Sequence, residues 1–141
     1  MKKIIFLLLG GLAIACGTSK TDNSKRPLYE VLTQQNNGGA GIRFFEILTE
    51  SNEIKMLQSD ENLRKKIKPE DINTSNFIIL NMGEKNSGGY SITVDNVQET
   101  ADKIIVTVKE NQPKSGQITT SVMSNPYTIV RINSKKEIVI K

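Results

Sequence analysis

The sequence has no histidine and no tryptophan, and among its 141 residues there is a single cysteine, Cys16. Without histidine, a Ser-His or Cys-His nucleophile pair is impossible, and so is a zinc or iron site with an imidazole ligand. One thiol cannot form a disulfide within the chain, so an oxidising compartment would not cross-link this fold. The stability of the protein must therefore come from packing.

Other kinds of site are poorly supported. No run of residues has the spaced acids of an EF-hand calcium loop. The 15 acidic residues leave a carboxylate pair for glycoside hydrolysis open, and a Ser-Lys dyad is also open, but nothing in the sequence selects either. Three tyrosines and no tryptophan are few for a carbohydrate cleft. We therefore expect a protein that is not an enzyme, with no catalytic residue, no metal and no cofactor.

The net charge is low. It is +4 for the whole chain, and it falls to +2 when Lys2 and Lys3 are removed with residues 1–15. Such a weak positive balance argues against nucleic acid as a partner.

The first residues predict export and a lipid anchor. Lys2 and Lys3 precede an apolar run over residues 4–15, and a run of about 12 residues is too short to span a bilayer, which takes roughly 20. Small residues then stand just before Cys16, as in a bacterial lipobox. We expect a signal peptide over residues 1–15 and acylation of Cys16, which places the protein on a membrane of the bacterial cell envelope, facing the periplasm or the surface. A plain secreted protein, or a buried free cysteine after a leader, are the alternatives.

The linker and the domain follow. Residues 17–26 contain no hydrophobic side chain, so we expect residues 16–26 to form a flexible tether. Residues 27–141 are enough for a single globular domain.

Within that domain the apolar patterns predict about seven strands and one helical segment. A helix is expected from Ser51, as N-cap, to about Ile67, or two short helices broken near Ser59. The nearly continuous apolar run 76–82 predicts a central strand with the helix on one side. The alternating runs 90–95 and 104–108 predict an antiparallel hairpin. The other expected strands are 28–32, 42–48, 126–132 and 137–140, and residues 117–123 form either an edge strand or an extended crossover.

The predicted class is therefore α+β or mainly β, an antiparallel sheet or sandwich of about seven strands with one helical cover segment. The basic run 64–68 lies where the helix should end, before Pro69. Cations are favourable at a helix C-terminus, so this run does not indicate a membrane or nucleic-acid site.

Two glycine-rich stretches, residues 38–41 and 83–89, raise the question of a nucleotide site. A phosphate cradle needs its glycines between a strand and a helix, whereas both stretches run into predicted strands. For the second stretch we expect a tight turn between the 76–82 and 90–95 strands, with glycine supplying positive φ.

Residues 70–132 resemble a known family. The segment NFIILNMGEKNSGGYSITVDNV (76–97), preceded by Asp71 and followed by Pro113, Gly116 and NPYTIV (125–130), is similar to the C-terminal domain of PrcB, the accessory subunit of a protease complex. Relatives in that family are mostly bacterial lipoproteins.

The resemblance implies a non-catalytic protein that binds or stabilises a separate protease. Its markers give the candidate partner-binding surface, which consists of Gly88, Gly89, Tyr90, Pro126 and Tyr127, and residues 117–123 are the candidate sheet edge. Two alternatives stay open: these residues only build a turn and a strand start, or the protein is a surface lipoprotein that binds a small ligand or a glycan.

Overall fold

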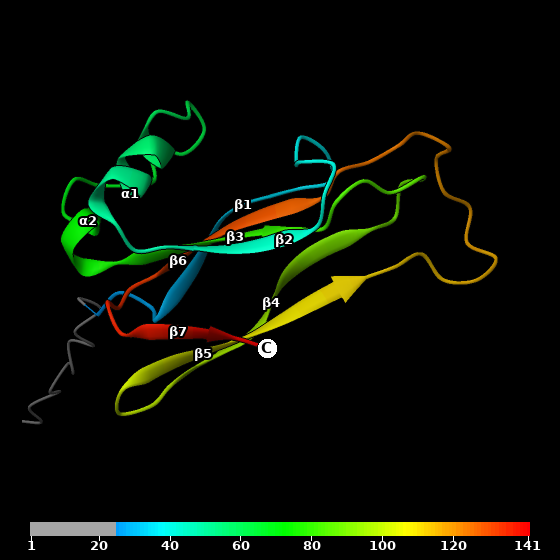
Figure 1. Ribbon diagram of the computed structural model, residues 1–141. Coiled ribbons are helices and arrows are strands. Elements are labelled where there is room, and N and C mark those ends of the chain that lie inside the picture. Colours follow the sequence, from blue (N-terminus) through cyan, green and yellow to red (C-terminus); the bar gives the residue numbers. More distant parts are fainter. Residues whose placement is uncertain (1–24) are drawn as a thin grey trace, which may run out of the picture.

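The structure is a computed structural model that describes residues 25–141. This part of the chain forms two sheets and two short helices (Figure 1). The elements are β1 (Tyr29–Gln35), β2 (Phe44–Leu48), α1 (Ser51–Gln58), α2 (Asp71–Thr74), β3 (Asn76–Asn81), β4 (Ser91–Glu99), β5 (Lys103–Asn111), β6 (Tyr127–Ile132) and β7 (Glu137–Ile140). The predicted class, mainly β with about seven strands, is confirmed.

The predictions for the N-terminal part of the chain lie outside the described residues. They are the signal peptide over residues 1–15, acylation of Cys16, and the tether up to residue 24. Over residues 25–141, the helices are too short and too polar to cross a bilayer.

The larger sheet has the strand order β1-β6-β3-β2 and is antiparallel throughout. The smaller sheet has the order β4-β5-β7. Its β4–β5 pair is antiparallel, as the predicted hairpin required, with a bulge between Val94 and Asn96, while β7 adds parallel to β5.

Strand β3 lies inside the larger sheet and is buried on both faces, as its continuous apolar sequence predicted. Ile78 and Leu80 pack into a core shared with the smaller sheet. Phe77 packs into a second core on the other face, together with Ile54 of α1. The predicted helix therefore covers one side of the strand, and the smaller sheet covers the other.

The helical segment breaks near Ser59, as the second of the two expectations had it, but the part after the break is not a helix. α1 ends at Gln58, and residues 59–67 form turns instead of helix. The carboxylate of Asp60 gives the physical reason, since its Oδ1 accepts hydrogen bonds from the backbone N–H groups of Asn62 and Leu63. Such local bonds compete with helical ones. Leu63 and Ile67 are nevertheless buried against the sheet, as predicted.

The start of α1 is displaced by one residue from the prediction. The N-cap is Glu50 rather than Ser51. The Glu53 carboxylate accepts a hydrogen bond from the backbone N–H of Glu50 at 3.1 Å, which is half of a capping box.

The basic run 64–68 does not end a helix, so the reason given for it from the sequence was wrong. Lys66 instead donates from Nζ to the backbone carbonyl of Leu32 in β1. The carbonyl of Lys66 accepts a hydrogen bond from Arg131 at 2.9 Å. The run therefore ties the turns after α1 to the larger sheet.

A buried ion pair joins α2 to β6. Asp71 is fully buried, and Arg131 is nearly so. Arg131 Nη1 lies 3.1 Å from Asp71 Oδ2, and the other oxygen of Asp71 accepts a hydrogen bond from Arg26, next to the start of the described chain. Arg131 also pairs with Glu30 of β1. This cluster fixes the entry of the chain to the helical side of the larger sheet.

The pKa of Asp71 reflects these contacts. Burial alone would raise the pKa of this carboxyl. The hydrogen bonds from Arg26 and from the backbone N–H of Lys68, together with the charge of Arg131, outweigh burial and hold the pKa below its ordinary value of 3.8.

We predict that Asp71→Asn destabilises the protein by about 3–5 kcal/mol at neutral pH, because it removes the buried carboxylate beside Arg131 and leaves that guanidinium only the more exposed Glu30 as a charged partner. Urea unfolding followed by circular dichroism measures this loss. The control is Asp95→Asn, an exposed aspartate, for which the change should stay within about 0.5 kcal/mol. Equal unfolding midpoints for the two variants would contradict the structural role of the pair.

The loss of stability in Asp71→Asn should depend on pH. Because the folded pKa of Asp71 is depressed, its stabilisation is complete above the ordinary value of 3.8 and is lost as the pH falls through the lower folded pKa. The stability difference between the wild type and Asp71→Asn should therefore shrink in acid. A difference that stays constant in acid would be inconsistent with a charged Asp71 in the folded state.

Candidate functional site

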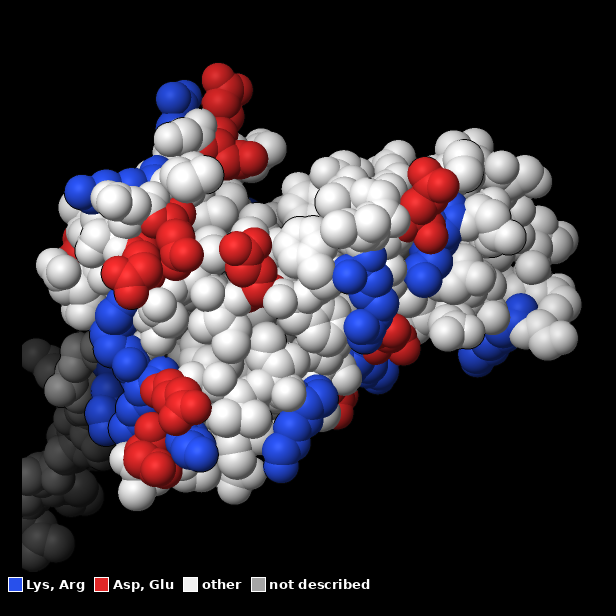
Figure 2. Space-filling view, viewed as in Figure 1, with Lys and Arg blue, Asp and Glu red and all other residues white. Residues whose placement is uncertain are grey.

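Three loop segments without charged residues lie at one end of the molecule. They are residues 36–42 of the β1–β2 loop, residues 86–90 before β4, and residues 115–125 of the crossover from β5 to β6. Arg43, Lys85 and Lys114 adjoin these segments. This end lies opposite the start of the described chain (Figure 1), and Figure 2 shows that its tip is mostly free of charged side chains. We call these three segments the uncharged end.

The connection from β3 to β4 is not the tight turn that the sequence predicted. The two strands belong to different sheets, so the chain has to cross from one sheet to the other. On the way, Lys85 and Ser124 exchange two backbone hydrogen bonds of 2.8 and 2.9 Å, and Gly88 N donates to the carbonyl of Thr120 at 3.0 Å. Gly89 has a φ of +86°, a conformation that glycine adopts without a steric penalty.

The crossover between β5 and β6 contains no strand over residues 115–125, apart from the isolated bridge at Ser124. The edge-strand interpretation of residues 117–123 is therefore wrong, and the crossover interpretation is right. The segment passes from the smaller sheet to the larger one, so no neighbouring strand lies along it. Its exposed side chains include Ile118 at 98%, Val122 at 67% and Met123 at 56%.

Asn81 holds the β1–β2 loop in place. Its side chain is buried at the end of β3, where Oδ1 accepts a hydrogen bond from Ala40 N at 3.0 Å and Nδ2 donates to the carbonyls of Ala40 and Ile42. Gly39 N donates to the carbonyl of Asn125 at 2.9 Å. The sequence analysis missed this function of Asn81. The available signal was a polar amide at the end of an otherwise apolar strand.

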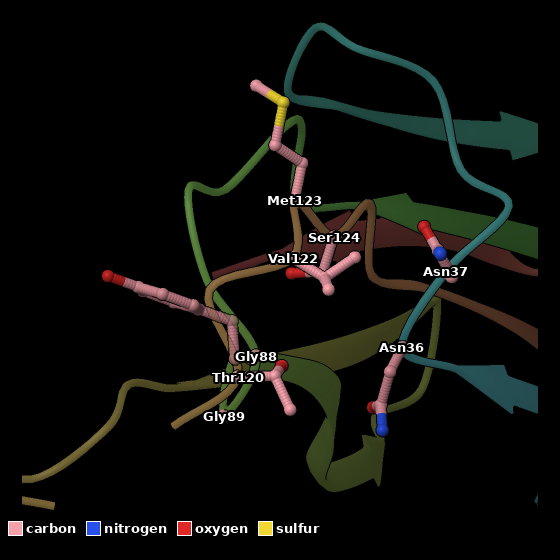
Figure 3. A pocket seen from close by; sticks show the side chains of 9 residues that line it. Asn36, Asn37, Gly88, Gly89, Thr120, Val122, Met123 and Ser124 are labelled. Atoms are coloured by element: carbon pink, nitrogen blue, oxygen red, sulfur yellow. The ribbon is translucent and has the colours of Figure 1, made fainter. Parts of the chain in front are cut away.

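Between the loops lies an open hollow of about 290 Å³. In Figure 3 the asparagines of the β1–β2 loop stand on one side of it and the crossover residues on the other. Its lining is neutral, with amides, hydroxyls and apolar groups from Asn36, Asn37, Gly88, Gly89, Tyr90, Thr120, Val122, Met123 and Ser124. Such a lining offers hydrogen bonds and apolar contacts without any carboxylate or amine.

The structure separates the five predicted surface residues into two groups. Gly88, Gly89 and Tyr90 line the hollow, although the partly buried Tyr90 also packs against the core between the sheets. Pro126 is buried, and its carbonyl accepts a hydrogen bond from Met82 N at 2.9 Å. Tyr127 packs against the core on the helical side. The side chains of these last two residues thus belong to the packing beneath the loops.

Carboxylates do not gather into a metal centre in the part of the chain that the structure describes: residues 25–141 contain no cluster of three or more candidate metal-ligating acids, histidines or cysteines.

The fold and this surface define a small, mainly β protein whose uncharged loops form an open hollow at one end. The model of the family described as PrcB C-terminal matches residues 76–133, which run from β3 to just past β6 and include the crossover. The predicted resemblance is confirmed, and this segment, less than half of the chain, belongs to that family. No curated protein and no solved structure matches the chain.

We predict that Gly39→Ala destabilises the protein, because its new Cβ would lie 2.3 Å from Asn81 Oδ1 and 2.8 Å from the carbonyl of Asn125. The Asn81 amide is held by its hydrogen bonds to Ala40 and Ile42, so overpacking should cost about 1–3 kcal/mol. Chemical unfolding measures the change. The control is Gly41→Ala, whose Cβ would meet nothing within 4 Å. If both variants unfold alike, the loop is not clamped as described.

Proposed function

We propose that this protein is a non-catalytic, lipid-anchored accessory protein of the bacterial cell envelope that binds a partner protein through its uncharged end. The observation that carries the proposal is the group of exposed apolar side chains on the crossover, Ile118, Val122 and Met123. Single exposed apolar residues are ordinary on protein surfaces, but a group of them on one loop marks an interaction site.

The chemistry of this end fits a protein interface. Charged residues are depleted at the centre of interfaces, where methionine and aromatic residues are enriched. Here Met123 and Tyr90 border the same hollow. The three segments carry no charge themselves, and the ammonium of Lys85 lies 5.7 Å from the centroid of the Tyr90 ring. The backbone bonds between Lys85 and Ser124 hold two of the loops together, so little ordering is needed on binding.

The family match supports a protease as the class of partner. PrcB is the accessory subunit of a protease complex, so we propose a protease as the partner, with this protein binding or stabilising it. The match covers two of the three segments of the uncharged end, the crossover and residues 86–90, and the β1–β2 loop lies before it. The chain has no histidine, and in this proposal the chemistry belongs to the partner.

The hollow also favours a second candidate function. Its lining combines the amides of Asn36 and Asn37 with the hydroxyls of Thr120 and Ser124, beside Tyr90. Amides and hydroxyls are suited to the hydroxyl groups of a sugar, so binding of a neutral glycan is the alternative to binding of a protein.

We predict that a photo-crosslinking amino acid at Val122, in the native cell, captures a protein. The double substitution Ile118→Asp with Val122→Asp should abolish co-purification of that protein, because it places two charges in the apolar patch. Both side chains are largely exposed, so the fold should be unaffected. The matched control is Asn62→Asp, an exposed residue in the turns after α1.

Co-purification that is unchanged in the double variant would contradict this site. Binding of a neutral sugar panel by the wild type, with no captured protein, would favour the glycan alternative.

We predict that Cys16→Ala releases the protein from membranes, since two acyl chains hold a protein stably and a short apolar leader does not. Fractionation followed by a high-salt wash of the membrane pellet measures the release. Persistence of the variant in the washed pellet would contradict the lipid anchor.

A further inference from the structure

A second surface lies at the edge of the larger sheet, away from the uncharged end. In the described part of the chain, β2 is one of the two outer strands of that sheet, with β1 at the other edge, and it pairs with β3 alone (Figure 1). An edge strand offers backbone N–H and C=O groups to an added strand. This edge therefore has the main-chain chemistry for β-strand addition.

A small hollow adjoins this edge. It has a volume of about 160 Å³ and lies between α1 and the strands β2 and β3. The lining is largely apolar, with Leu48, Met56, Leu57 and Ile79, and includes the carboxylates of Glu46 and Glu53. Apolar cavities of about 150 Å³ accept a benzene ring, so the hollow has room for one large apolar side chain.

The alternation of β2 directs an added strand toward the hollow. Phe45 and Ile47 pack against the core between the two sheets, so Glu46 and Leu48 point to the other face, where α1 lies. Every second side chain of a strand added to β2 would point to that same face. One of these side chains would then enter the hollow.

Two carboxylates beside the hollow favour a partner segment that carries a basic residue. Glu53 is fixed, because its Oε2 accepts hydrogen bonds from Thr49 N and Glu50 N, each at 3.1 Å. Glu46 is exposed, and the salt bridges found within residues 25–141 include neither of these two glutamates. A lysine or arginine next to the entering apolar side chain would meet this acidic rim.

A second copy of this chain is a poor occupant. Glu46 is the middle residue of β2, so an antiparallel pairing of two β2 strands about a two-fold axis would bring the two Glu46 side chains together. Like charges directly opposite each other in a sheet are destabilising. The charge pattern therefore favours a different strand with a basic residue.

We propose that the β2 edge and its hollow bind an extended segment of another protein, in which a large apolar residue is followed or preceded, two positions away, by lysine or arginine. The segment adds to β2 as a strand, its apolar side chain fills the hollow, and its basic side chain faces Glu46 and Glu53. This site lies apart from the uncharged end and adds to the proposed function.

The test uses the full chain in detergent micelles and short synthetic peptides of alternating pattern. Each peptide has a central leucine or phenylalanine, and the residues two positions to either side are lysine, serine or glutamate. Fluorescence anisotropy should rank binding as lysine above serine above glutamate. Methylation of alternate peptide nitrogens should abolish binding if main-chain pairing is required.

Charge reversal provides the matched variants. Glu46→Lys should weaken binding of the lysine peptide roughly fivefold to tenfold and strengthen that of the glutamate peptide. Glu137→Lys, the same change at an exposed position of the edge strand β7, should leave both affinities unchanged. The double variant Ile118→Asp with Val122→Asp should also leave them unchanged, which separates this site from the uncharged end.

The proposal is overturned if no peptide of the set binds, if lysine and glutamate peptides bind equally, or if backbone methylation has no effect. Concentration-dependent dimerisation that blocks peptide binding would also overturn it, in favour of a second copy as the occupant.

Discussion

Both faces of the larger sheet have to be covered at β3 and β6, and the elements that cover the two faces differ in size. One face lies against the smaller sheet, where the buried Thr128 hydroxyl donates to the carbonyl of Ile92 and so joins the two layers. The other face has only α1, α2 and the turns between them. The small acidic hollow lies on this second face, between α1 and the strands β2 and β3.

Local patterns were sufficient for the strands and for the position of β3. The run 76–82 is apolar at almost every position because both of its faces are buried, and the alternation of β4 and β5 reflects one buried face. Gly88 and Gly89 were predicted as turn residues and Tyr90 as the start of a strand; β4 starts one residue later, at Ser91, and all three residues lie around one hollow. The strands follow from the spacing of apolar side chains along the chain, which can be read directly from the sequence.

The remaining features depend on contacts between distant residues. The apolar pattern says which face of a strand is buried but not which strand lies beside it, so β3 and β4, consecutive in the chain, were not recognised as members of different sheets. Asp71 and Arg131 are 60 positions apart, and their pairing has no local pattern. The early end of α1 rests on a single side chain, Asp60, whose bonds compete with the helix.

Under the proposed acylation of Cys16, the tether and the length of the domain set the greatest distance that the uncharged end can reach from a membrane. If Cys16 is acylated, residues 17–26 span at most about 35 Å at full extension. Arg26 is bound to the buried Asp71, so the domain begins there. Strand β5, nine residues long, runs from the end of the molecule where α2 lies toward the crossover (Figure 1) and adds about 30 Å. Under the proposed anchor, this reach allows the uncharged end to meet a partner that protrudes from the bilayer.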